Sequence, residues 1–181
     1  MGARAARARA RVRGLLLALA PRIYLRHACR RGRRPAGSAL GLAGEELAAR
    51  HLRRRGWRLR GRRVATPCGE VDLWAWRPGV SACVEVKTGV LALVPRPSGW
   101  RARGPAAGGG RAALWWDLRW RPGLRVDQRR VRRLLCSARF LAGAAGGAPR
   151  VDLIEVLVAE GGRRVQLIHH EDLRRRPFAR P

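Results

Sequence analysis

Three residues, Asp72, Glu85 and Lys87, have the types and spacing to carry out chemistry. They lie in two apolar segments, GEVDLWAW and ACVEVKT, which RPGVS separates. Two carboxylates suit a divalent cation, and an ammonium group stabilises negative charge on a phosphate. Lys87 is the only lysine in a chain rich in arginine. Arginine cannot replace it in such a role, because a buried ammonium can lose its proton whereas guanidinium stays protonated.

The two segments predict neighbouring β-strands, because alternate side chains of a strand share a face. One face would carry Glu70, Asp72, Trp74 and Trp76 with Cys83, Glu85 and Lys87, and the other Val71, Leu73, Ala75, Val84 and Val86. A turn centred on Pro78-Gly79 places Asp72 opposite Glu85 and Glu70 opposite Lys87. Opposed side chains lie about 4.5–5.5 Å apart at Cβ. A turn shifted by one residue would separate them.

Adjacent carboxylates repel each other, and a divalent cation would offset that repulsion. Mg²⁺ or Mn²⁺ held by Asp72 and Glu85, with the Val86 carbonyl as a third ligand, is the cofactor that this pattern predicts. Lys87 would orient a water molecule or stabilise charge on a phosphate. A plain surface ion pair between Glu85 and Lys87, with Asp72 serving a turn, is the alternative that the pattern leaves open.

The elements that must position these residues indicate an α/β (α+β) fold, a mixed sheet flanked by helices in the order α-β-β-β-α-β-β. A helix begins near Ser38 and Gly56 stops it. A strand in WRLRGRRV precedes the two strands described above. A second helix, DQRRVRRLLCSARFLAG, ends at Gly143, and RVDLIEVLV and RRVQLIHH form a closing hairpin across AEGG.

The chain divides into one domain with basic ends. We expect residues 1–37 to form a tail that is disordered or loosely helical. The tail is basic because the first carboxylate of the chain is Glu45. The domain spans 38–172 and contains a Pro-, Gly- and Trp-rich insertion at 89–125. Residues 173–181 form a basic C-terminal tail.

Net charge favours a polyanionic partner. The 181 residues carry a formal charge of +28, so nucleic acid is the expected partner and an anionic membrane surface is less favoured. No apolar run is long enough to span a bilayer. The four cysteines show no zinc-site spacing, and we expect free thiols in a reducing cytoplasm. Adjacent histidines at 169 and 170 would point to opposite faces of a strand and so do not predict a metal site.

Asp72 followed by Glu85-Val86-Lys87 resembles the PD-(D/E)xK signature of restriction-endonuclease-like nucleases. The ordered blocks GLAGEELAARHLRRRGWRLRGRR, GEVDLWAW, CVEVKTG, RRVRRLLCSARFLA and APRVDLIEVLV resemble the bacterial YraN family, which is assigned to that fold. The resemblance covers residues 38–172 apart from the insertion. It implies a restriction-endonuclease-like sheet, metal-binding roles for Asp72 and Glu85, and a catalytic role for Lys87.

The same resemblance implies roles for further residues. Glu45 matches a position that approaches the metal in Holliday-junction resolvases, directly or through water; an exposed helical glutamate is the alternative. Glu70 would support the metal ligands without touching the ion. Arg130 stands where the family often has lysine. The arginines of the second helix would flank a groove for the nucleic-acid backbone, or simply form a solvated face: Arg129, Arg130, Arg132 and Arg133.

Two functions follow as expectations. The first is an endonuclease that uses Mg²⁺ or Mn²⁺ to hydrolyse phosphodiester bonds in DNA, branched DNA included. The second is a non-catalytic nucleic-acid-binding protein with a vestigial nuclease site. We expect the protein to lie in the bacterial cytoplasm, and association with the nucleoid is one alternative within it. A homodimer would suit a symmetric junction, and the sequence leaves it open.

Overall fold

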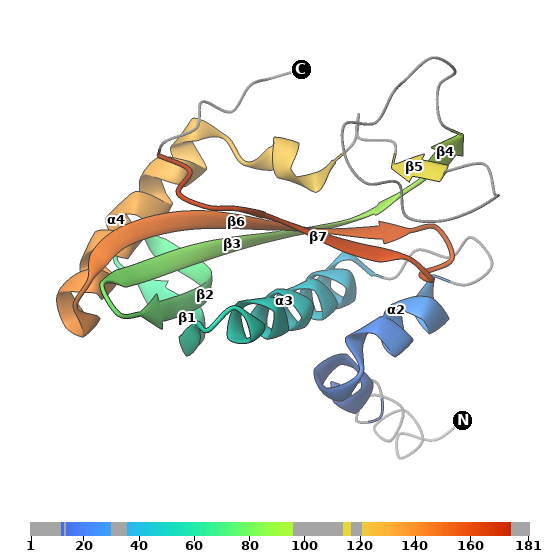
Figure 1. The fold of residues 1–181 in the computed structure, drawn as a ribbon, viewed down its shortest axis with the longest axis horizontal. Helices are drawn as coiled ribbons and strands as arrows, with labels where there is room; N and C mark the ends of the chain where they lie inside the picture. The colour runs from blue at the N-terminus through green and yellow to red at the C-terminus, as the bar shows by residue number, and fades with distance from the viewer. Residues whose placement is uncertain (1–11, 13, 30–35, 96–113, 117–120, 175–181) are drawn as a thin grey trace.

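A five-stranded mixed sheet with helices on both faces organises the chain (Figure 1). The computed structural model describes residues 12, 14–29, 36–95, 114–116 and 121–174. Its elements are α2 (Pro21–Ala28), α3 (Gly37–Arg54), β1 (Arg58–Thr66), β2 (Gly69–Arg77), β3 (Val80–Leu91), β4 (Leu93–Pro95), β5 (Leu114–Trp116), η3 (Pro122–Arg125), α4 (Gln128–Ala145), β6 (Ala148–Ala159) and β7 (Val165–His170). From α3 onwards, the predicted order α-β-β-β-α-β-β is confirmed, with β4, β5 and η3 inserted after β3.

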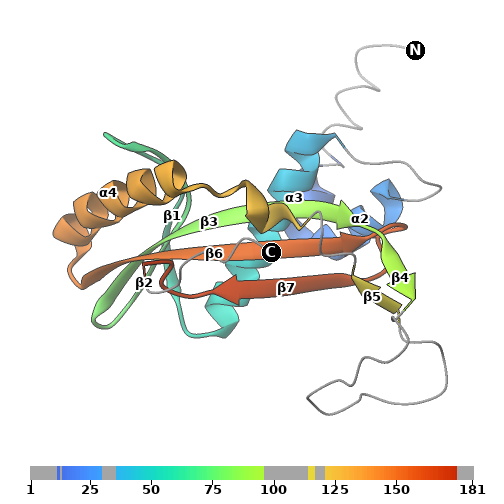
Figure 2. The ribbon, with the colours of Figure 1, turned by 90° about the horizontal axis from the view of Figure 1, so that it is seen from above.

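The sheet has the strand order β1-β2-β3-β6-β7. Only β3 and β6 run parallel, and α4 makes the crossover that a parallel pair needs. The other pairs are antiparallel hairpins. Strands β4 and β5 form a separate two-stranded sheet beyond the end of β3 (Figure 2).

Two hydrophobic cores lie on opposite faces of the sheet, with α3 and α2 on one side and α4 on the other (Figure 1). The α3 side buries Leu47 and Leu52 against Leu73, Val84 and Ile154, among others. The α4 side buries a second set of side chains, which includes Leu134, Leu141, Val151, Leu153 and Cys83. Because both faces are covered, the central strands β3 and β6 are apolar along most of their length.

Glycine marks the helix ends, although one end lies later than predicted. Gly56 follows α3 with a positive φ of 79°, as expected for a residue that stops a helix. Gly143 does not end α4, which continues to Ala145. The stop is Gly146, whose φ is 75° and whose N–H donates to the Ala142 carbonyl. A single glycine within a helix weakens it without breaking it, so the prediction at Gly143 was wrong.

Part of the segment expected to be a tail is folded. Helix α2 lies within residues 1–37 and packs against α3, with Leu25 fully buried. The expected insertion at 89–125 contains the end of β3, then β4, β5 and η3. The remainder of that insertion, at 96–113 and 117–120, lies outside the described residues, as do 1–11, 30–35 and 175–181.

The cysteines differ from the expectation of four free thiols. Cys68 and Cys136 form a disulfide, while Cys29 and Cys83 are free and buried. Cys68 lies in the turn between β1 and β2, and Cys136 lies on α4. The packing of α4 on the sheet brings the two together across 68 positions, a proximity that sequence spacing cannot reveal. No helix in the described ranges is long and apolar enough to cross a membrane.

Candidate functional site

The predicted turn at Pro78-Gly79 is confirmed, but the strands separate sooner than expected. Strands β2 and β3 pair from Arg77↔Val80 to Leu73↔Val84. Beyond Leu73, β2 pairs with β1 only. The cross-strand pairs predicted for Asp72 with Glu85 and for Glu70 with Lys87 are therefore absent from the described ladder. Two neighbouring strands that diverge leave backbone donors for side chains to satisfy.

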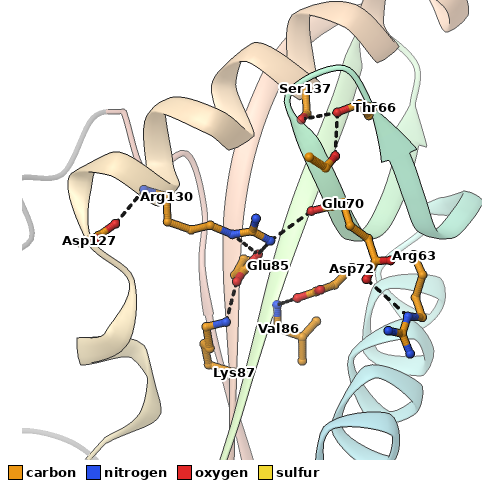
Figure 3. Close-up of polar contacts among 11 residues, drawn as sticks. Arg63, Thr66, Glu70, Asp72, Glu85, Val86, Lys87, Asp127, Arg130 and Ser137 are labelled. Carbon is orange, nitrogen blue, oxygen red and sulfur yellow. Dashed lines mark hydrogen bonds and ion pairs between the residues drawn. The ribbon is translucent and has the colours of Figure 1, made fainter. Parts of the chain in front are cut away.

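Asp72 fills the gap between the diverging strands. Its Oδ2 accepts a 2.7 Å hydrogen bond from the Val86 N–H, taking the place of a backbone carbonyl of β2 (Figure 3). The alternation of faces also changes here, because Val71 packs in the α4 core whereas Leu73 packs in the α3 core. The prediction that Val71 and Leu73 share a face was wrong, since β2 is free to twist once it leaves β3. Val84 and Val86 do lie on the α3 side, as predicted.

Glu85 is the anionic centre of the site. Its side chain is only 1% exposed, and both carboxylate oxygens are engaged. The Lys87 Nζ lies 2.6 Å from Oε1, while Arg130 donates to Oε2 from Nε at 3.0 Å and from Nη2 at 2.6 Å (Figure 3). Arg130 also donates from Nη2 to the Glu70 carbonyl at 3.1 Å. Two cationic side chains thus contact one buried carboxylate, and both of its oxygens accept charge-assisted hydrogen bonds.

The first turn of α4 places the Arg130 side chain against the sheet. Asp127 caps this helix, and its Oδ1 accepts from the Arg130 N–H at 2.7 Å. Arg130 shares a helix face with Leu134, Ala138 and Leu141, which pack on the sheet. The three other predicted arginines, Arg129, Arg132 and Arg133, are exposed. Arg130 is therefore part of the site, while its neighbours are available to solvent and to a polyanion.

Gly44 lets Glu45 approach the site from the α3 side. A Cβ on Gly44 would lie 1.8 Å from the Thr88 Oγ1, so only glycine allows α3 to lie this close to β3. Glu45 follows directly and is partly buried. Its electrostatic partners include Asp72 and Glu70. Glu45 thus lies on the side of the site where α3 packs. Its approach to a metal ion, which the family resemblance implies, stays a prediction.

Burial and mutual repulsion raise the pKa values of two carboxyl groups of the site, Asp72 and Glu45. Burial, followed by the charge of Glu85, raises the pKa of Asp72, although the Val86 N–H, Lys87 and Arg130 oppose the rise. Burial and then Asp72 raise the pKa of Glu45. Burial works against the charge of Arg130, but its hydrogen bonds to Glu85 raise its pKa. A cation added beside Asp72 would oppose this rise, as Lys87 and Arg130 already do.

Glu70 and the expected metal ligands complete the set of predicted residues. The Glu70 side chain is half exposed and pairs with Arg63 at 3.3 Å, so it contributes its carbonyl rather than its carboxylate to the site. Within the described residues, no three side chains of the His, Cys, Asp and Glu types are grouped so that they could hold a metal ion. Of the three expected metal ligands, Asp72 and Glu85 lie on either side of the β2–β3 divergence, and Glu45 interacts electrostatically with Asp72 from α3.

Sequence reasoning missed two buried acidic residues on β6. Asp152 accepts from Arg150 and His169, and Glu155 accepts from Arg121 and His170. The adjacent histidines point to opposite faces, as predicted. His169 contacts Asp152, and His170 contacts Glu155. Asp152 and Glu155 interrupt the apolar run RVDLIEVLVA, and that interruption was the available signal.

Comparison with known proteins identifies one family. The model of "Uncharacterised protein family UPF0102" matches residues 44–95, a range that includes Glu45, Asp72, Glu85 and Lys87. A UPF0102 protein of Rhizorhabdus wittichii is 36% identical over 132 residues, which cover 73% of this chain and 89% of that protein. A UPF0102 protein of Sphingopyxis alaskensis is 36% identical over 109 residues, covering 60% and 71%. A third, from a Caulobacter species, is 48% identical over 63 residues, covering 35% and 45%.

Proposed function

The chain belongs to the uncharacterised protein family UPF0102, and from that premise we propose that it is a divalent-cation-dependent phosphodiesterase acting on DNA, branched DNA included. The proposed site is of the PD-(D/E)xK type. One observation carries the proposal: where β2 and β3 diverge, Asp72 accepts from the N–H of Val86, the residue between the paired Glu85 and Lys87, and burial raises the pKa of Asp72. Perturbed carboxylates beside a cation are typical of catalytic sites.

The chemistry of the donor set fits Mg²⁺ or Mn²⁺. Asp72 and Glu85 offer carboxylate oxygens, which hard cations prefer. Burial, followed by the charge of Glu85, raises the pKa of Asp72, and a bound cation would offset the repulsion between these two carboxylates. Asp72 uses Oδ2 for the Val86 N–H, and the described residues make no hydrogen bond to its Oδ1. When bound, the cation would polarise the phosphate and lower the pKa of a coordinated water.

The chain's own residues would position and stabilise the phosphate. The Lys87 side chain is 31% exposed, so it can contact a phosphate while Glu85 holds it. A compact positive charge there stabilises the additional negative charge of the transition state. Arg130 presents a planar fork that suits two phosphate oxygens. Exposed Arg129, Arg132 and Arg133 would hold neighbouring backbone phosphates and exclude competing orientations of the strand.

A second candidate function follows from the contacts that the Glu85 carboxylate already makes. Lys87 and Arg130 already engage both carboxylate oxygens, as a purely structural ion-pair cluster would. In that case the protein binds nucleic acid through its arginines, and the cluster only stabilises the fold. Both functions predict affinity that falls steeply with salt, because phosphate contacts release counterions. Only the first predicts cleavage.

A nicking assay separates the two functions. Wild type, Asp72→Asn, Lys87→Ala and Lys87→Arg are incubated with four-way junction, single-stranded and duplex DNA, with Mg²⁺, Mn²⁺ or EDTA. We expect cation-dependent cleavage by wild type, reduced at least about a hundredfold in each variant. Lys87→Arg is the informative variant, because it retains the positive charge beside Glu85 but replaces the compact ammonium with a planar guanidinium.

Arg133→Ala is the matched control, since it removes an exposed charge of α4 without touching Glu85. It should weaken DNA binding and leave the cleavage rate of bound DNA close to that of wild type. Equal DNA binding by all four proteins with no cation-dependent cleavage by any of them would refute the phosphodiesterase and support the binding protein. Because Lys87 is the only lysine, amine-reactive labelling followed by mass spectrometry reports directly whether DNA covers the site.

A further inference from the structure

The polar surface beside Lys87 continues across two more strands. In the parallel ladder Lys87 is the partner of Glu155, and in the next ladder Leu153 is the partner of His170. Alternation places Glu85, Lys87, Glu155 and His170 on the face of the sheet that α4 covers, since Leu153 belongs to the α4 core. Adjacent strands lie about 4.8 Å apart. A group held by Glu155 therefore lies next to Lys87.

Glu155 is a fully buried carboxylate with an unusually complete set of donors. It accepts from the Arg121 Nε at 3.1 and 3.2 Å, from the Arg121 Nη2, and from the Gly123 N–H at 2.6 Å, and it lies 2.7 Å from the His170 Nε2. Burial opposes its charge, but the bonds from His170, Arg121 and Gly123 lower the pKa of Glu155 to about 2. The carboxylate is thus ionised at neutral pH, and its bonds orient the Arg121 guanidinium.

The short helix η3, which Arg121 precedes, packs on β3 and β6. A Cβ on Gly123 would lie 2.4 Å from a Glu155 oxygen, so a glycine is required there. A Cβ on Gly89 of β3 would lie 3.3 Å from the Pro122 ring, which shows that η3 also packs on the strand that carries Lys87. These contacts hold Arg121 rigidly over β3 and β6. Preorganised cations of this kind bind anions with little loss of conformational entropy.

Arg121 retains capacity for a ligand. Its side chain is 29% exposed and that of His170 is 21% exposed, although both contact a carboxylate that is fully buried. Guanidinium has five N–H donors, and the two on Nη1 make no hydrogen bond to any residue that the structure describes. We infer that Arg121, held by Glu155 and His170, is a second phosphate-binding residue that contacts the DNA backbone beside the phosphate at Lys87. This inference rests on the proposed function for its ligand class.

A charge-neutral double variant tests the inference. Arg121→Gln with Glu155→Gln removes one positive and one negative charge, so the net charge of the protein is unchanged, and two amides can replace the buried ion pair. Arg125→Gln is the control, because Arg125 lies in the same η3 helix, is exposed, and loses a full positive charge. Thermal unfolding verifies that each variant is folded. Affinity for a labelled DNA duplex is then measured in EDTA over a series of salt concentrations.

We expect the double variant to bind about fivefold to tenfold more weakly than wild type at low salt. Its slope of log affinity against log salt should be smaller by about 0.9, the value for one phosphate contact. Arg125→Gln should change both quantities less. Duplexes with single methylphosphonates should reveal one position at which wild type loses affinity and the double variant does not.

Affinity and slope equal to those of wild type in the double variant would overturn the inference, as would an equal or larger loss in Arg125→Gln. Cleavage by a double variant with wild-type DNA affinity leaves the proposed function standing without this contact. A reduced slope in the double variant supports the phosphate contact even if wild type cleaves no substrate. In that case the contact stands and the proposed function is removed.

Discussion

Arg130→Ala removes the guanidinium that covers Glu85. In wild type this group makes hydrogen bonds of 3.0 and 2.6 Å to one Glu85 oxygen and one of 3.1 Å to the Glu70 carbonyl. Glu85 is almost fully buried in wild type, and in the variant Lys87, at 2.6 Å, would be its remaining cationic partner. We therefore expect the variant to be destabilised, and to respond more strongly than wild type to a divalent cation.

The magnitude follows from the burial of Glu85. Removing one partner of a buried ion pair costs about 3–5 kcal/mol, because the remaining charge is left without compensation. Lys87 still compensates Glu85, so we expect the lower end, a loss of about 3 kcal/mol in the free energy of unfolding. Arg130→Lys retains a positive charge but loses the fork and the Glu70 contact. It should cost about 1–2 kcal/mol, the value of one or two hydrogen bonds.

Urea denaturation followed by tryptophan fluorescence and circular dichroism measures these differences, with and without Mn²⁺. A cation at Asp72 and Glu85 stabilises the folded state by about 2.7 kcal/mol when its concentration is a hundred times its dissociation constant. Mn²⁺ should therefore recover most of the stability lost in Arg130→Ala and should raise that of wild type less, because Arg130 competes for Glu85. Arg129→Ala, an exposed neighbour, should change stability by less than about 0.5 kcal/mol.

Two outcomes would refute this reasoning. If Arg130→Ala unfolds at the same urea concentration as wild type, the Glu85 pair does not hold the site together. If Mn²⁺ stabilises both proteins equally, Arg130 and the cation do not compete for the same carboxylate.

Two further predictions concern Asp72 and the disulfide. Because burial and Glu85 raise the pKa of folded Asp72 above its ordinary value of 3.8, the folded state loses stability as the pH rises through that raised pKa. Asp72→Asn, which can still accept from Val86, should therefore unfold at higher temperature than wild type at neutral pH, and the gain should vanish below pH 3.8; a variant less stable than wild type at neutral pH would contradict this. The Cys68–Cys136 bond closes a loop of 68 positions, for which chain entropy gives about 4 kcal/mol. Reductant should lower the wild-type urea midpoint to that of Cys136→Ser, and a wild-type midpoint that reductant leaves unchanged would show that the bond does not form in solution.

Local patterns were sufficient for the order of the main helices and strands from α3 to β7. The alternation of apolar and polar residues predicted β2 and β3, and Pro78-Gly79 predicted a register that holds over five residue pairs. Neighbours along the chain decide both features. The same reasoning identified Asp72, Glu85 and Lys87 as one group, although it assumed that the ladder continues to Asp72.

That assumption failed because the length of a ladder depends on more than its own two strands. Strand β2 turns away after Leu73, so Asp72 accepts from Val86 and does not lie opposite Glu85. Val71 moves into the α4 core for the same reason. Residue types along one strand contain no information about where its partner strand separates from it.

The sequence by itself determined the order of helices and strands, the Pro78-Gly79 turn and the three residues around which the site is built, because each depends on spacing over a few positions. Only the tertiary structure decided the partners of those residues. Arg130 reaches Glu85 from 45 positions away, Arg121 reaches Glu155 from 34, and Cys136 reaches Cys68 from 68. The physical reason is that such contacts arise from the stacking of α4 and η3 on the sheet, and that arrangement depends on the burial of both apolar cores at once.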